Sequence, residues 1–413
     1  MTARVPAGPR TDRAARGSLP GAGHRYVRVE PPGSVPSAPR LHSPATAIPM
    51  NKKLLPLPLL LLTPWVDAQD DETYRLSTGD PFLDLSGGVS VGSHSFAPRR
   101  HDDWTSGRPD GHAPIGVMGD HLHSEGEWMV SVRVMRMHMD GMQNNGNDLS
   151  PADVFAQGFA VTPTEMDMDM IMLGGMYAPS DNLTLMAMIP YLSFSMDHVT
   201  GMGGSFTTES EGLGDVVLSG MYGVADHAGQ RVHLNLGLSL PTGSVDERDD
   251  TPAMANAKLP YPMQLGTGTF DLLPGITYLG QDGDWSWGAQ QQFRFHLGEN
   301  DEGYKQGNRF EVTGWVARRL GNVSVSGRLR HAHWENFHGS DPDLNPAMVP
   351  TADPDLRGGD RLDALFGLNA YLQDGPLAGH RFAFEFGVPV YQDLDGPQLE
   401  TDWILTLGWQ LAG

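Results

Sequence analysis

Twelve methionines lie at every second position, or nearly so, along three consecutive segments of the chain. They are Met129, Met135, Met137, Met139, Met166, Met168, Met170, Met172, Met176, Met186, Met188 and Met196. A two-residue period is that of one face of a β-strand. Thioether sulfur is a soft, uncharged ligand that suits Cu(I) or Ag(I) and holds hard ions poorly. The spacing therefore predicts a row of weak, soft sites along which such an ion could step.

The opposite face of the same segments is apolar and carries no methionine, as at Trp128, Val130, Ile171, Leu173 and Leu185. A strand with hydrocarbon side chains on one face and sulfurs on the other has its two faces in different surroundings. A membrane β-barrel provides both surroundings, because lipid meets one face of each strand and the lumen meets the other. We therefore expect the methionines to line a lumen.

The composition excludes several other classes of protein. The chain has 413 residues, a formal net charge of −22 and no cysteine. Strong acidity argues against a nucleic-acid partner, and without cysteine there is no disulfide framework or thiolate metal site. No apolar run approaches the roughly 20 residues that a transmembrane helix needs. We expect no resident cofactor, although transient Cu or Ag ions fit the methionines.

The first part of the chain is expected to stand apart from the barrel. Residues 1–49 have no hydrophobic period, which predicts disorder or a translated extension upstream of the true start. Residues 50–68 combine a basic stretch, a short apolar stretch and small residues at a cleavage site, which is typical of a secretory signal peptide. Residues 69–125 are predicted to form a flexible His- and Asp-rich periplasmic segment, either a plain linker or a plug, which could collect metal.

Residues 126–413 predict an all-β fold, a closed antiparallel β-barrel of about 12 strands in the bacterial outer membrane. Segments with a two-residue period lie near 127–139, 165–177, 183–196, 213–224, 231–241, 265–279, 285–297, 309–319, 322–334, 361–373, 380–391 and 401–411. Short turns alternate with mostly longer connections, such as 140–164 and 197–212, as periplasmic turns alternate with extracellular loops. A soluble β-sandwich also has alternating strands, but nothing here would cover its apolar outer faces.

Several stretches resemble a known family, in particular 113–123 (APIGVMGDHLH), 126–129 (GEWM), 240–244 (LPTGS) and 259–264 (LPYPMQ). Together they are similar to the outer-membrane transporter barrels related to the meta-pathway phenol-degradation porins, in a subgroup associated with copper and other heavy metals. The resemblance runs from about Ala113 to Gly413. It implies a barrel that contacts membrane lipids, a small solute or metal ion, and the outer-membrane assembly machinery. The C-terminus departs from the usual barrel pattern, because four residues follow the last aromatic, Trp409.

Three functions remain open for the lumen. In the first, the channel carries soft metal ions on Met135, Met137, Met139, Met166, Met168, Met170, Met186, Met188, Met196, His138 and His198. His138 has the outward parity of Trp128, so it reaches the lumen only if its strand has already ended. In the second, the channel carries hydrophobic or aromatic small molecules, because methionine is a pliable hydrophobe that fills irregular space. In the third, the lumen is packed and the barrel has a structural role.

Charged side chains are also expected on the inward faces. They are Arg133, Asp215, Asp271, Arg294, Arg309, Glu311, Arg328, Arg330 and Glu385. They could form a constriction of both signs that orients a polar solute. Alternatively, they pair with one another inside a narrow barrel.

The sequence does not indicate an enzyme. A barrel can be a membrane lipase, and His331 and His333 have outward parity with Asn336 beyond them, but no serine lies at a matching position. A GxSxG string at 88–92 lacks the strand-to-helix context of a nucleophile elbow. The chain contains no HExxH, P-loop or dinucleotide motif. A channel is therefore the expected class.

Overall fold

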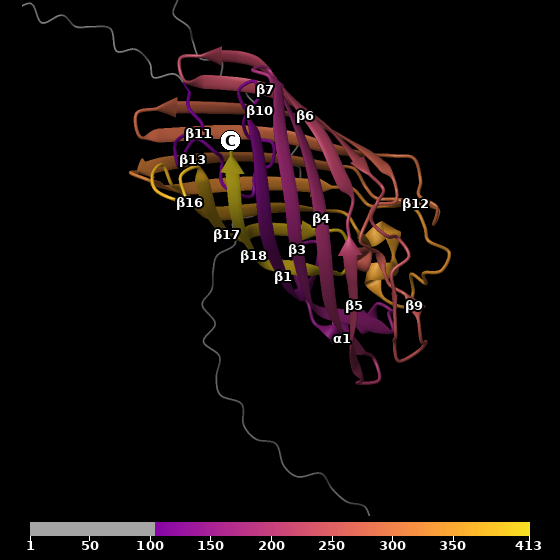
Figure 1. Cartoon of the computed structure of the whole chain (residues 1–413). Helices are drawn as coiled ribbons and strands as arrows, with labels where there is room; N and C mark the ends of the chain where they lie inside the picture. The colour runs from indigo at the N-terminus through magenta and orange to yellow at the C-terminus, as the bar shows by residue number, and fades with distance from the viewer. Residues whose placement is uncertain (1–103) are drawn as a thin grey trace, which may run out of the picture. The chain divides into compact units, whose positions relative to one another are not determined.

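The structure, a computed structural model, describes residues 104–413. The predictions for residues 1–103, which include the signal peptide and the first part of the 69–125 segment, lie outside the described residues. The described part consists mainly of long strands that curve around a common interior (Figure 1). Within residues 104–413, no helix is long and apolar enough to cross a membrane.

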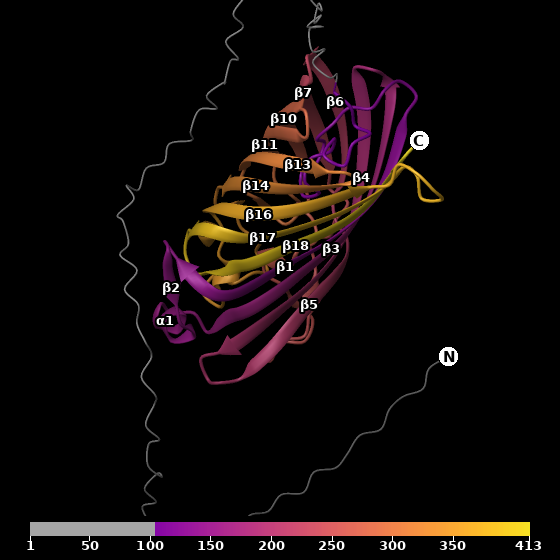
Figure 2. The same cartoon turned by 90° about the vertical axis from the view of Figure 1, so that its left-hand side faces the viewer.

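Twelve strands close into an antiparallel barrel (Figures 1 and 2). They are β1 (Trp128–Asn144), β3 (Val161–Ser180), β4 (Leu183–Thr200), β6 (Val216–His227), β7 (Gln230–Leu240), β10 (Phe270–Asp282), β11 (Trp285–Leu297), β13 (Arg309–Leu320), β14 (Val323–Trp334), β16 (Gly359–Tyr371), β17 (His380–Leu394) and β18 (Gln398–Ala412). Each strand pairs with the next one along the chain, and β18 pairs with β1 to close the ring. The prediction of a closed twelve-stranded barrel is confirmed.

Two further strands extend the same sheet beyond the ring, β2 (Asn147–Leu149) and β5 (Ser205–Leu213). The prediction that 197–212 is a loop was wrong. β4 continues to Thr200 and pairs with β6 only as far as Met188, opposite Val217. From Tyr191 onward β4 pairs with β5 instead. The cause is a change of partner along one strand, which the alternation of side chains does not reveal.

The predicted orientation of the two strand faces is confirmed. Leu173 and Leu236 are 53% and 59% exposed on the outer surface, whereas Met172 and Met196 are 7% and 1% exposed on the inner side. Burying a side chain of this size stabilises a fold by about 1.5–3 kcal/mol, so leucines stay on an outer face only where lipid replaces water. The outer surface of the barrel is therefore its lipid-facing surface.

The two ends of the barrel differ. At one end the strands are joined mainly by two-residue turns, as between β3 and β4 and between β6 and β7, and the chain ends there at Gly413. At the other end the connections are mostly longer and contain short elements: α1 (Pro151–Ala156), β8 (Arg248–Asp249), β9 (Ala257–Lys258), η1 (Tyr261–Met263), β12 (Tyr304–Lys305), β15 (His338–Gly339), η2 (Pro350–Ala352) and η3 (Pro354–Leu356). These are the periplasmic and extracellular ends of an outer-membrane barrel.

Candidate transport site in the barrel lumen

The methionines of β1, β3 and β4 form one continuous surface inside the barrel. Met135 lies opposite Met170, and Met139 lies opposite Met166, which in turn lies opposite Met196 on β4. Directly opposed residues of an antiparallel pair share a face and lie roughly 5 Å apart. The sulfur-bearing side chains of three strands are therefore neighbours, in a register that the sequence pattern alone does not define.

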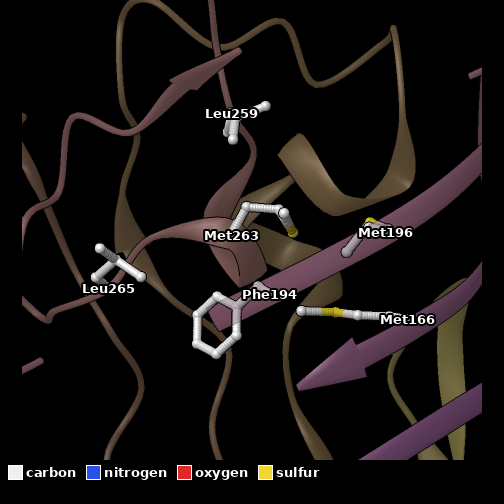
Figure 3. Close-up of a cluster of buried hydrophobic side chains, with 6 residues drawn as sticks. All are labelled: Met166, Phe194, Met196, Leu259, Met263 and Leu265. Carbon is white, nitrogen blue, oxygen red and sulfur yellow. The ribbon is translucent and has the colours of Figure 1, made fainter. Parts of the chain in front are cut away.

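At the extracellular end, this surface packs against a loop that folds inward between β7 and β10 (Figure 3). The buried cluster consists of Met166, Phe194, Met196, Leu259, Met263 and Leu265. The first three lie on β3 and β4, and the last three lie in the loop. Ser210 on β5 donates a hydrogen bond of 2.7 Å to the carbonyl of Met263 and holds the loop in place. These methionines fill space as core residues do.

Toward the periplasmic end, residues 104–125 lie inside the barrel, where the indigo trace before β1 runs within the ring of strands (Figure 2). The carbonyl of Gly119 accepts a hydrogen bond of 2.9 Å from Asn235 Nδ2 on β7. The backbone N–H of Gly116 donates one of 3.1 Å to Glu385 Oε2 on β17. Five strands separate β7 from β17 in either direction around the ring. The segment therefore crosses the lumen.

Further contacts hold this segment in place on both sides of the crossing. Leu122 packs against a buried cluster formed by Met129, Met176 and Met221. Near the start of the segment, Arg381 Nη1 donates a hydrogen bond of 2.8 Å to the carbonyl of Pro109. Because these partners come from different strands, the segment is held by the closed ring.

A cavity of about 530 Å³ lies between the inward-folded loop and the crossing segment. Seven methionines line it: Met118, Met135, Met168, Met170, Met172, Met186 and Met188. Ile115, Phe194, Val217 and Leu273 add hydrocarbon surface. Small-molecule sites in proteins have volumes of roughly 300–1,000 Å³ and mostly apolar walls. The cavity has the size and lining of such a site.

Three charged residues also line the cavity. Arg133 Nη1 lies 2.8 Å from Met118 Sδ, and Arg133 Nε has no hydrogen-bond partner among the residues that the structure describes. Asp215 accepts hydrogen bonds of 2.9 and 2.8 Å from the backbone N–H groups of Gly243 and Thr267. Arg294 lies on the wall with its Nη1 3.9 Å from Asp271. Of the three, Arg133 alone is buried, and its Nε lies within the wall without a partner among the described residues.

The remaining lumen charges are paired within the barrel. Arg328 and Glu385 form a bidentate ion pair with contacts of 2.8 and 2.7 Å. Arg330 bonds to Asp363 at 2.6 Å. Other close contacts are Arg361–Asp363, Arg309–Glu311 and His296–Asp271. The partners Asp363, Arg361 and His296 were not among the residues singled out from the sequence, because pairing depends on register between distant strands.

The two predicted histidine ligands lie away from the cavity. His138 is on the outer face, where its Nδ1 is 2.8 Å from Asp167 Oδ1 and its ring stacks on Trp403. It does not reach the lumen, because β1 keeps its alternation from Trp128 to His138 and the register shifts only after His138. His198 is buried on the inner side and stacks on Phe206 with ring centroids 4.8 Å apart.

The predicted methionine ligands divide into groups. Met135, Met168, Met170, Met186 and Met188 line the cavity. Met166 and Met196 belong to the extracellular cluster, and Met139 packs against it. Arg361 Nη1, part of the guanidinium group, lies 3.8 Å from Met137 Sδ. A positive group beside a sulfur disfavours a metal cation at that sulfur.

The residues considered for a lipase do not form a catalytic triad. His331 Nε2 and His333 Nδ1 both contact Asp360, at 3.2 and 3.1 Å. The side-chain oxygen of Asn336 instead accepts hydrogen bonds from the backbone N–H groups of Arg357 and Gly358. At the extracellular rim, the two histidines and Asp360 therefore hold one another in place, and Asn336 holds the backbone.

A closed barrel with a lipid-facing surface and a luminal site defines an outer-membrane channel. Residues 141–343 match the family described as "Putative MetA-pathway of phenol degradation". Over this segment, which is just under half of the chain, the match agrees with the resemblance to the phenol-degradation barrels, and it does not indicate the copper-associated subgroup.

Several solved structures share the barrel fold at low identity. An outer-membrane channel from Pseudomonas putida F1 is 15% identical, with 72% of this chain and 99% of that chain covered and a TM-score of 0.49. A FadL homologue from Pseudomonas aeruginosa is 11% identical, with 74% and 98% covered and a TM-score of 0.35. The CymD monoaromatic hydrocarbon channel is 8% identical, with 70% and 89% covered and a TM-score of 0.31. No curated protein matches the chain.

Proposed function

We propose that the barrel conducts small hydrophobic molecules, with aromatic compounds as the favoured class, across the outer membrane. The observation that carries this proposal is the cavity of about 530 Å³ lined by seven methionines. Its volume suits a solute of one or two rings, and the methionines and other apolar side chains form a large part of its wall. The matched family is named for phenol degradation, which agrees with an aromatic solute.

The chemistry of methionine supports passage as well as binding. The side chain has three rotatable bonds and a polarizable sulfur, and each sulfur–aromatic contact contributes about 0.3–1.5 kcal/mol. Several weak contacts of this kind favour entry of a ring without holding it in one position. Rotation of Met170, Met172 or Met186 would let the wall adapt to solutes of different shapes.

Arg133 would give the site a polar end. Arg133 lines the cavity, and its guanidinium has as its hydrogen-bond partner among the described residues only the sulfur of Met118, a weak acceptor, 2.8 Å from Nη1. Hydrogen bonds from a charged donor are about twice as strong as neutral ones. We expect a hydroxyl or carboxylate on the ring to face Arg133 while the ring lies among the methionines.

Soft metal transport, with the copper association of the resembled subgroup, is the second candidate. The observation in its favour is the register that places Met135 opposite Met170. Against it, the guanidinium groups of Arg133 and Arg361 contact the sulfurs of Met118 and Met137. These positive charges disfavour a cation on this path. We therefore place the hydrophobic solute first.

Uptake measurements on matched variants test the proposal. Met188→Trp fills the cavity, whereas Met202→Trp adds the same side chain at a position that is 98% exposed. In cells that depend on the channel, we expect Met188→Trp to slow toluene uptake about tenfold, a change of ~1.4 kcal/mol in the barrier. Met202→Trp should leave uptake unchanged. Equal rates in both variants would contradict the proposal.

A second variant separates the solute from the metal. Replacing Met170, Met172, Met186 and Met188 with leucine keeps the cavity apolar and removes four of its seven sulfur ligands. A hydrophobic channel should then retain most of its toluene uptake. Loss of copper or silver accumulation together with intact toluene uptake would show that metal is a separate cargo. A barrel that transports neither before mutation would have a structural role.

A further inference from the structure

The segment that crosses the lumen contains a compact cluster of ligand-type side chains. His112, Asp120 and His121 each place one ligand atom within 4.8 Å of the others. The rings of His112 and His121 have centroids 3.8 Å apart, and the ring of His123 follows at 4.8 Å from His121. His112 and His123 also border a water-accessible vestibule of about 850 Å³ on the periplasmic side. The cluster is therefore reachable from the periplasm.

Three imidazole nitrogens in the cluster are buried without a partner. Within residues 104–413, none of His112 Nδ1, His121 Nε2 and His123 Nε2 has a hydrogen-bond partner. All three residues are at least nine-tenths buried. Buried polar atoms are nearly always bonded, and leaving one unsatisfied costs about 1–3 kcal/mol. Three such atoms on neighbouring rings point to a missing ligand rather than to packing alone.

Asp120 orients the cluster. Its Oδ1 lies 2.9 Å from His121 Nδ1, and its Oδ2 accepts a hydrogen bond of 2.8 Å from the backbone N–H of Ala113. The contact with Ala113 also brings residues 112–113 against residues 120–121. The hydrogen bond between Ala113 and Asp120 therefore holds the two ends of the intervening turn together.

We propose that His112, Asp120 and His121 bind a divalent transition-metal ion of intermediate softness, such as Zn(II), Ni(II) or Cu(II), with His123 placed as a fourth ligand. Imidazole with carboxylate is a donor set for these ions and not for Cu(I) or Ag(I), which favour the thioethers elsewhere in the barrel. Ligands roughly 2.0–2.2 Å from one ion lie at most about 4.4 Å apart. The ligand atoms of His112, Asp120 and His121 all lie within 4.8 Å of one another, so small rotations of the rings suffice to bring them into that range.

The ion would lock the segment across the lumen. It would join His112 to residues 120–121 and so fix the turn whose carbonyl at Gly119 is held by Asn235. This inference is independent of the proposed transport function.

Metal binding to the purified, folded barrel tests the inference. After chelator treatment, titration with Zn(II) should show one ion per chain with micromolar or tighter affinity. The double variant H112Q/H121Q keeps polar side chains of similar size but removes two ligands, and it should bind at least about tenfold more weakly. The control H227Q/H338Q removes two exposed histidines and should bind as the unaltered protein does.

Co(II) provides a spectroscopic reading of the same site. The unaltered protein should develop visible absorption bands of a protein-bound ion, and H112Q/H121Q should not. The single variant His112→Gln guards against misfolding, because it leaves the Asp120–His121 hydrogen bond in place. Absence of stoichiometric binding in the unaltered protein, or equal binding in His112→Gln, would overturn the inference.

Discussion

The ion pair between Arg328 and Glu385 shows how single charges are accommodated inside the barrel. Both side chains are almost fully buried, and two hydrogen bonds of 2.7–2.8 Å join them. The same carboxylate also accepts the backbone N–H of Gly116. Taking two charges out of water costs several kcal/mol per ion, and close pairing offsets that cost. The pair therefore stabilises the wall and anchors the crossing segment at once.

Glu385→Gln should destabilise the barrel strongly. It leaves Arg328 buried without its counter-charge, for which a loss of about 3–5 kcal/mol in the free energy of unfolding is expected. Asp169→Asn, the matched control, breaks the ion pair with Arg136 on the outer face near the rim, where about 1 kcal/mol or less is expected. Urea unfolding followed by tryptophan fluorescence measures both. Similar losses in the two variants would show that the luminal pair is solvated.

At the scale of elements, the crossing segment depends on close approach of its backbone to the wall. A Cβ atom at Gly116 would overlap the carboxylate of Glu385 and the guanidinium of Arg328. Gly119 has φ of +61° and lies 3.0 Å, measured from its would-be Cβ, from Asn235 Nδ2. Both positions therefore require glycine, one for space and the other for space and backbone conformation. The strand side chains that approach the segment most closely therefore determine which of its positions need glycine.

Gly116→Val should open the channel. The added side chain displaces the segment from β17, so single-channel conductance in a planar bilayer should rise above that of the unaltered protein. Gly107→Val is the control in the same segment, because its Cβ would meet Thr105 Oγ1 at an ordinary 3.5 Å. Unchanged conductance in Gly116→Val would mean that the segment does not limit the current.

At the scale of the whole molecule, the extracellular end is tied together by one amine. Lys258 Nζ lies 3.1 Å from Asp246, 3.2 Å from Glu302 and 3.0 Å from Asp341. These carboxylates come from the connections that follow β7, β11 and β14. The amine therefore joins three loops above the cavity.

The contacts of Lys258 predict that their contribution to the stability of the protein is constant over a middle range of pH and is lost at acid and at alkaline pH. Burial alone would lower the pKa of Lys258, but its close contacts with carboxylates, that of Asp341 first, raise it above the ordinary 10.5. Hydrogen bonds from Arg248 and Lys258 lower the pKa of Asp246 below the ordinary 3.8. A raised pKa gives stability that is complete below 10.5 and lost as pH rises through the raised value. A lowered pKa gives stability that is complete above 3.8 and lost as pH falls further.

Lys258→Met checks the plateau. The difference in Tm between this variant and the unaltered protein should be largest between about pH 4 and pH 10 and should shrink below pH 3. Lys305→Met removes a lysine from a neighbouring extracellular strand, β12, and should show a smaller difference that varies little with pH. A difference for Lys258→Met that is constant down to pH 2 would contradict the role of its carboxylate partners.

The amino-acid sequence by itself determined the barrel, the approximate positions of the twelve strands of its ring and the inward direction of its methionines. Each of these follows from a period of two along a strand, which is a local property of the chain. The alternation of outward leucines with inward methionines, as at Leu173 and Met172, already distinguishes the lipid-facing side of a strand from its luminal side. The outward position of His138 followed from the same parity once the length of β1 was known.

Only the tertiary structure decided what occupies the lumen. Residues 104–125 have no period, so nothing local indicates that Gly116 meets Glu385, a residue 269 positions away. The inward folding of the loop that carries Met263 and the pairing of Arg330 with Asp363 are likewise set by strand register and loop closure. Such contacts depend on which distant segments the closed ring brings together, because closure fixes distances that the order of residues leaves free.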